Sequence, residues 1–197
     1  MEHPLTPLLK KDFDFAAALH LLNRAGFGGT PQQVQALVEM GLDGALGVLV
    51  EYDTSEPRKP GERSETEPPR DRGPLFANGE FRPDVLREPT PEEREALRRA
   101  RTQGDEETIA RLEAMRQQRE RDDRAQLALM QKSWLQRMIE TPRPLEEKLT
   151  LFWHGHFATG YRTIENSWHM ALQNEMFRRY GSGEFQTLVR GIISDPA

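Results

Sequence analysis

The longest helical pattern in the chain covers residues 106–140 and reads EETIARLEAMRQQRERDDRAQLALMQKSWLQRMIE. Thr141-Pro142 ends it, because proline cannot continue a helix. Residues 116–124 contain no apolar side chain, which predicts that water surrounds this part of the helix. Apolar residues then return at spacings of three and four and form a stripe that can pack: Leu127, Met130, Trp134 and Met138.

Helical signals also occupy the rest of the chain. Thr30-Pro31-Gln32-Gln33 and Thr90-Pro91-Glu92-Glu93 are capping boxes with proline at the first helical position, and the helices they open should end near Gly41 and before Gly104. Apolar spacing predicts further helices over residues 13–25, 42–52, 164–180 and 184–193, and one that begins at Pro144. We find no alternating strand pattern of useful length. The predicted fold class is therefore all-α, a multi-helix domain.

A change of composition interrupts this domain. Residues 53–90 hold seven of the fourteen prolines and few apolar groups, so they cannot bury enough surface to offset the entropy of ordering them. We expect a long hydrophilic insertion, a proline-rich disordered linker. The favoured interpretation is a flexible loop without a specific role, and the alternative is that residues 75–86 dock on a neighbour. Residues 1–52 then form an N-terminal helical part, residues 91–124 charged solvent-exposed helices, and residues 125–197 a helical core part.

The last residues resemble the start of a helix. Ser194-Asp195-Pro196-Ala197 places an N-cap type of residue before a proline. From this pattern we expect the domain to be incomplete, truncated at its C-terminus.

The charge pattern argues against a nucleic-acid partner. The 197 residues carry 27 basic and 32 acidic side chains, a net charge of −5. Ten of the 22 arginines lie in residues 87–124 together with eleven acids, so this span has a net charge of −1. Opposite charges three or four residues apart are typical of a solvated helix whose ion pairs each contribute about 0.2–0.5 kcal/mol. We expect an arm that binds protein and does not bind nucleic acid.

Other classes are limited by composition. The chain has no cysteine, which removes disulfides, thiolate metal sites and cysteine nucleophiles. No apolar run approaches the roughly 20 residues of a membrane span, and we read no signal peptide, so the cytoplasm is the default compartment. Gly26-Phe27-Gly28-Gly29 lacks the ending of a phosphate loop and is read as a helix stop and turn. Ser167 lies in a helical stretch without the strained turn that a serine nucleophile needs.

The candidate site is the stretch Phe152-Trp153-His154-Gly155-His156-Phe157. Successive residues of a helix turn by about 100°, so the two histidines can share one divalent metal ion if Gly155 breaks the helix. A third ligand could come from His169, Glu165 or Glu147, which lies two turns before His154. The competing interpretation is structural: aromatic residues at a helix end are usually core, and His-x-His alone is a weak metal signature.

Two blocks of sequence carry a family resemblance. Residues 21–31, LLNRAGFGGTP, and residues 147–157, EKLTLFWHGHF, resemble the opening and the central block of the DUF1800 family, and residues 173–178, 183–185 and 194–197 are similar to later segments of that family. The resemblance implies a largely helical bacterial protein of uncharacterised function that continues beyond residue 197. It also implies a partnership with a DUF1501-type protein in an envelope- or export-linked system.

Two hypotheses about function remain open. In the favoured one the chain is a non-catalytic assembly or scaffold component, in which the aromatic and histidine residues fix one helix end and the charged helix meets a partner. In the alternative it is a metal-dependent or acid–base enzyme with a partial site at His154, His156, His169 and Glu147, where a divalent metal would polarise a substrate or activate water.

Overall fold

The computed structural model describes residues 7–50, 82, 85–86 and 88–197. The described residues form helices and connecting turns, with no strand among them, which confirms the all-α prediction. Most of the expected linker over residues 53–90 lies outside the described residues. At its described end, the backbone N–H of Arg82 donates to Gln126 Oε1 at 2.8 Å and Val85 is buried.

The chain divides into two compact units. Unit 1 contains the described residues up to Val50, Leu135–Ala158 and Asn174–Asp195. Unit 2 contains the described residues from Arg82 to Trp134, Thr159–Gln173 and Pro196–Ala197.

Unit 1 begins with a 3-10 turn, η1 (Lys10–Asp12), and two helices, α1 (Phe15–Ala25) and α2 (Pro31–Leu49). Asp14 caps α1, and the predicted capping box at Thr30 is present at the start of α2. Gly41 (φ 72°) kinks α2 where the sequence predicted a helix end. Buried apolar side chains from both helices form one core, on which Leu145 of a later helix also packs: Ala18, Leu22, Ala25, Val34, Leu37, Ala45 and Leu49.

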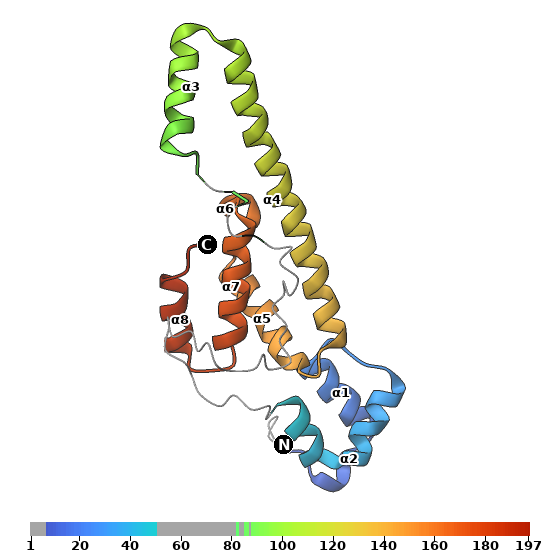
Figure 1. The fold of residues 1–197 in the computed structure, drawn as a ribbon. Helices are drawn as coiled ribbons and strands as arrows, with labels where there is room; N and C mark the ends of the chain where they lie inside the picture. Colours follow the sequence, from blue (N-terminus) through green and yellow to red (C-terminus); the bar gives the residue numbers. More distant parts are fainter. Residues whose placement is uncertain (1–6, 51–81, 83–84, 87) are drawn as a thin grey trace, which may run out of the picture. The chain divides into compact units, whose positions relative to one another are not determined.

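The rest of unit 1 is built on α5 (Pro144–His156), the second half of α7 (Ser167–Tyr180) and α8 (Phe185–Ile193), whose courses can be followed in Figure 1. Phe177, Tyr180 and Leu188 form its second core. Trp153 and Phe157, from the end of α5, pack on that core. The candidate motif therefore lies at a junction of three helices within one unit.

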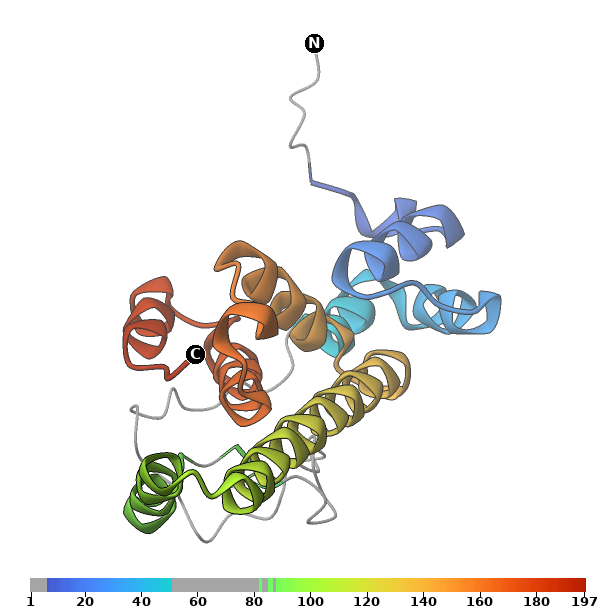
Figure 2. The ribbon, with the colours of Figure 1, turned by 90° about the horizontal axis from the view of Figure 1, so that it is seen from above.

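Unit 2 contains a helical hairpin made of α3 (Pro91–Gln103) and the first half of α4 (Glu106–Glu140). Thr90 opens α3 with a capping box, and Gly104 ends it in the left-handed conformation at φ 68°. Figures 1 and 2 show α3 beside the amino-terminal half of α4. An ion pair of 3.3 Å between Arg119 Nη1 and Glu93 Oε1 joins the two helices. We call residues 90–124 the charged hairpin.

The remaining part of unit 2 packs on the middle of α4. The helix predicted over residues 164–180 is interrupted: α6 (Tyr161–Ile164) ends at Glu165, which is left-handed at φ 49°, and α7 starts afresh at Ser167. Met130, Met170 and Ala171 form the core of this region. None of the described helices is both long enough and apolar enough to cross a membrane.

Candidate functional site

The two sequence blocks that carry the family resemblance meet in unit 1. Lys148 of α5 donates from Nζ to the carbonyl oxygens of Asn23 and Gly26, each at 2.5 Å. These carbonyls end α1, where no further turn of helix can satisfy them and where a positive charge is favoured. The ammonium also lies 5.9 Å from the centre of the Phe27 ring. Lys148 is thus a cap for α1 supplied by another helix.

Close contact at this junction explains two glycines of the Gly26-Phe27-Gly28-Gly29 turn. A Cβ on Gly26 would lie 2.9 Å from Cβ of Pro144, the first residue of α5. A Cβ on Gly29 would lie 2.3 Å from Leu22 Cδ2. At Gly26 the contacts are with a rigid proline and with the backbone oxygen of Leu22 at 3.0 Å, so this position requires a residue without a side chain. At Gly29 the contact is with the end of the Leu22 side chain, which would have to shift. α1 ends at Ala25 and α2 begins at Pro31, as the helix-stop interpretation predicted.

A buried ion pair lies on the inner face of α5. Glu147 Oε1 accepts from Nε of Arg178 at 2.7 Å, and Glu147 Oε2 accepts from Nη2 at 3.0 Å. Each side chain is 1% exposed. Two parallel hydrogen bonds to a guanidinium are the strongest arrangement for such a pair, and in a dry site each partner depends on the other. Both oxygens of Glu147, one of the predicted ligands, are therefore engaged by Arg178.

Further polar groups surround Arg178. It donates to Asn174 Oδ1 at 2.7 Å and to Glu175 Oε1 at 2.9 Å. Burial opposes its charge, but the hydrogen bonds to Glu147 and the nearby carboxylates outweigh burial and raise the pKa of Arg178. Burial, and then repulsion by Arg178, lower the pKa of Arg137 near the end of α4. Residues 137, 147, 174, 175 and 178 therefore form one coupled network.

Asn174 has one group that the network leaves unsatisfied. Its side chain is buried and its Oδ1 accepts from Arg178, which fixes the orientation of the amide. Its Nδ2 makes no hydrogen bond to the described residues. A buried donor without an acceptor is uncommon in folded proteins and costs free energy.

The two histidines of the motif leave α5 in different directions. α5 continues through His156, so the helix break expected at Gly155 is wrong, and residues two apart on a helix point about 200° apart. The ring of His156, which is exposed, stacks on Phe152 at 5.8 Å between centroids. His154 is half-buried, with its ring 6.2 Å from that of Phe177.

Trp153 fixes the end of α5. Its indole Nε1 donates to the carbonyl of Gly181 at 2.7 Å, and its ring stacks on Phe157 at 5.8 Å. A Cβ on Gly181 would lie 2.7 Å from Trp153 Cδ1 and 2.5 Å from the carbonyl oxygen of Phe177. The glycine after α7 thus allows the tryptophan to reach the backbone, and the aromatic residues of the motif act here as helix packing.

The remaining predicted ligands belong to unit 2. His169 is half-buried in the first turn of α7, where its backbone N–H donates to Asn166 Oδ1 at 3.0 Å. Glu165 is exposed at the end of α6. Over the described ranges, no group of three or more histidine, aspartate or glutamate side chains is arranged to hold a metal ion.

Unit 2 has a buried polar cluster that the sequence did not predict. Asp123 of α4 is 1% exposed, so the expectation of water around residues 116–124 is wrong at this position. Its carboxylate accepts from Ser167 N at 3.0 Å, from Ser167 Oγ at 2.6 Å and from the hydroxyl of Tyr161 at 2.7 Å. Gln126 Nε2 donates to Ser167 Oγ at 3.0 Å. Asp123 thereby caps the start of α7, where a negative charge is favoured.

The same cluster perturbs a titrating group. Burial, together with the hydrogen bond to the Asp123 carboxylate and its charge, raises the pKa of Tyr161 from 10.0 to about 12. Ser167 is fully buried and both donates and accepts within the cluster, so it is a structural residue and not an exposed nucleophile. No local signal marked Asp123, because a single aspartate in a charged helix looks like its exposed neighbours.

Comparisons with known proteins identify a family. The family model described as "Protein of unknown function (DUF1800)" matches residues 20–197. No curated protein and no solved structure matches the chain. The matched range includes both blocks that meet at Lys148, the Glu147–Arg178 pair and the Asp123 cluster.

Proposed function

The chain belongs to the DUF1800 family of proteins of unknown function, and on this premise we propose that it is a non-catalytic assembly or scaffold component that binds a protein partner through the charged hairpin. The observation that carries the proposal is the construction of the hairpin. Both ends of α3 are capped, by Thr90 and Gly104, so the element has defined limits. One charged side chain of the hairpin, that of Asp123, is deeply buried in unit 2. This burial anchors the hairpin.

The surface of the hairpin favours recognition of a protein. Its ion pairs, such as Arg99–Glu95 at 2.9 Å and Arg116–Glu120 at 2.9 Å, are exposed, so each contributes about 0–1 kcal/mol and can be exchanged for a pair with a partner. Interspersed charges of both signs give specificity and orientation in encounters between proteins. A helix that is polar on all sides has little apolar surface to bury, so a partner would recognise it through its charges.

The packing of the candidate motif supports the same proposal. Trp153 is tied to Gly181 and Glu147 to Arg178, which are contacts that hold helices together. The family resemblance suggests the partner and the setting: a DUF1501-type protein in a bacterial envelope- or export-linked system.

A co-purification experiment tests this proposal. The full chain is co-expressed with a tagged DUF1501-type protein, and the complex is isolated and sized by chromatography in low and high salt. We expect a complex of fixed stoichiometry that weakens as salt rises, because exposed charge pairs are screened. Absence of a complex at low salt would contradict the proposal.

A second candidate function, an acid–base or metal-dependent enzyme with a site at His154, has one observation in its favour. His154 is half-buried and lies two turns from buried Glu147 on α5, in the same unit as the unsatisfied Nδ2 of Asn174. A buried donor without an acceptor is compatible with a ligand that accepts a hydrogen bond.

Elemental analysis tests the metal-dependent form of this candidate. The wild type and His154→Ala would be purified in parallel and their metal content measured. A stoichiometric metal in the wild type that is lost in His154→Ala would support it. An equal and substoichiometric metal content in both samples would contradict the metal-dependent function.

A further inference from the structure

We propose that Arg94, Arg98 and Arg101 of α3 form a docking surface for an acidic amphipathic segment of a protein partner. We call these three residues the α3 arginine row. The inference rests on the proposed binding role of the charged hairpin and adds to it the surface that is contacted and the chemistry of the partner.

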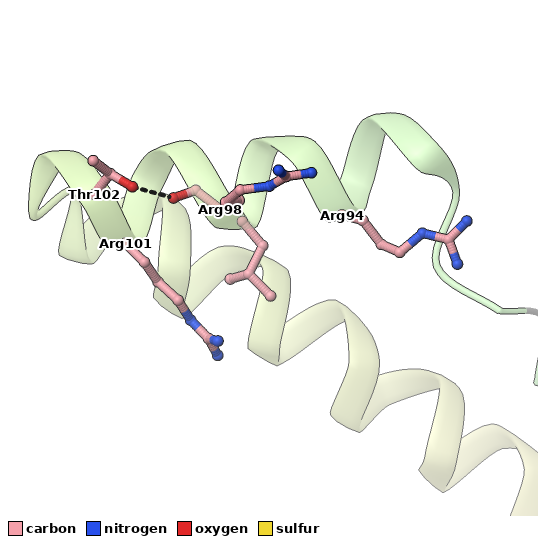
Figure 3. A pocket seen from close by; sticks show the side chains of 5 residues that line it. Arg94, Arg98, Arg101 and Thr102 are labelled. Carbon is pink, nitrogen blue, oxygen red and sulfur yellow. Dashed lines mark hydrogen bonds between the residues drawn. The ribbon is translucent and has the colours of Figure 1, made fainter.

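The α3 arginine row has the spacing of a single helix face. Its members stand at positions i, i+4 and i+7, which places them on one side of α3 over about 10 Å of helix axis. Together with Leu97 and Thr102 they line a hollow of about 380 Å³. Figure 3 shows Arg94 and Arg98 extending toward the amino-terminal end of α3, and Arg101 extending away from them, downward in that view.

The guanidinium groups of the row are available to a partner. Arg94 is paired with Glu88 at 3.6 Å and Arg98 with Glu95 at 3.0 Å, and both arginine side chains are more than half exposed. Pairs of this kind contribute about 0–1 kcal/mol and are readily replaced. Arg101 makes no ion pair with the residues that the structure describes. A carboxylate that approached the row would gain two-pronged hydrogen bonds with little loss of existing contacts.

The other lining residues define the rest of the ligand. Thr102 Oγ1 already donates to the carbonyl of Arg98 at 3.0 Å, so polar recognition falls to the three guanidinium groups. Leu97 adds an apolar side chain to the same hollow. A matching segment therefore carries carboxylates at helical spacing around an apolar residue, which is the pattern of an amphipathic acidic helix.

A polyanionic nucleic acid fits this surface less well than an acidic peptide does. Residues 87–124 hold eleven acids and ten arginines, so an extended phosphate backbone would meet as many repulsive groups as attractive ones. A short segment that covers the row alone avoids most of them. The occupant we infer is therefore a protein segment.

Fluorescence anisotropy with the full chain tests this inference. The probe is a labelled synthetic helical peptide with three glutamates at i, i+4 and i+7 around a leucine, compared with the same peptide carrying glutamines and with a labelled DNA duplex. The test variant is Arg94→Gln/Arg98→Gln/Arg101→Gln. The control Arg24→Gln/Arg162→Gln/Arg190→Gln removes the same charge from exposed positions outside the charged hairpin.

We expect the acidic peptide to bind the wild type, and the test variant to bind it about tenfold more weakly or worse, while the control changes by about twofold or less. Equal weakening in both variants, or tighter binding of the duplex than of the acidic peptide, would overturn the inference. The same variants bound to the DUF1501-type protein separate the two proposals. If the complex with the DUF1501-type protein forms equally well with the test variant, the inference about the α3 arginine row is overturned and the proposed scaffold role stands. If the test variant weakens peptide binding but no complex with the DUF1501-type protein forms, the inference about the α3 arginine row is supported and the proposed partner is contradicted.

Discussion

Removing Arg178 should be among the most damaging single changes to this protein. In Arg178→Met the apolar stem is kept but the guanidinium is lost, and the carboxylate of Glu147, 1% exposed, remains buried without its two hydrogen bonds. Breaking a buried pair from one side costs about 3–5 kcal/mol. The total free energy of unfolding of a domain is typically about 5–15 kcal/mol, so the variant should be only marginally folded.

The double variant Glu147→Leu/Arg178→Met should recover much of this loss. Replacing both members of a buried pair by apolar groups is often close to neutral, although here Asn174 Oδ1 also loses its donor, which costs about 1–3 kcal/mol. We therefore expect the free energies of unfolding of the two single variants and the double variant to show a coupling of about 2–4 kcal/mol.

Urea unfolding followed by circular dichroism measures all four members of the cycle. Arg179→Met is the matched control, because Arg179 is the exposed neighbour of Arg178 and its replacement should change the free energy of unfolding by about 0.5 kcal/mol or less. If Arg178→Met unfolded like Arg179→Met, or if the effects of the two single variants simply added, the reasoning about the buried network would be refuted.

Three further predictions concern the stability effects of other buried or close contacts. Asp123→Asn, which replaces an acceptor of three donated hydrogen bonds, should lose about 2–4 kcal/mol in urea unfolding, whereas Asp122→Asn at the neighbouring, less buried position should lose far less. Because folding raises the pKa of Tyr161 from 10.0 to about 12, its contribution to stability is complete below pH 10 and is lost as the pH rises toward 12. The stability advantage of the wild type over Tyr161→Phe should therefore shrink across that interval, and a constant difference would count against the Asp123–Tyr161 contact. Gly181→Ala should cost about 1–3 kcal/mol in thermal or urea unfolding because its Cβ meets Trp153, whereas Gly155→Ala has open space and should be neutral or stabilising. Equal effects of the two alanines would argue against close packing at Gly181.

Much of the fold was predictable because its boundaries are set by local chemistry. The capping boxes at Thr30 and Thr90, the proline at residue 144 and the glycine at residue 104 act through their immediate neighbours, and the structure places helix ends at each of them. The helix end predicted near Gly41 corresponds to non-helical backbone at that residue (φ 72°, ψ 174°), which separates two helical stretches of α2, whereas the interruption at Glu165 was not predicted. Apolar spacing continues across Glu165 and does not show that the backbone turns there.

The candidate site was harder to predict because its contacts are not local. The helix end at residues 154–156 looked like a place where two imidazoles could meet, but Gly155 is tolerated inside α5 and the rings diverge. Glu147 was singled out from its spacing to His154, yet its partner is Arg178, thirty-one residues away. Asp123 and Arg178 resemble ordinary surface charges in the sequence, and the partners across the helix interfaces reveal that they are buried.

The central claim is that the charged hairpin is the partner-binding element of this protein. Hydrogen exchange measured by mass spectrometry, on the full chain alone and with a DUF1501-type protein, tests it most directly. We predict slower exchange over residues 90–124 on binding, with little change over α5. A complex that protects α5 or α8 and leaves residues 90–124 unchanged would contradict it.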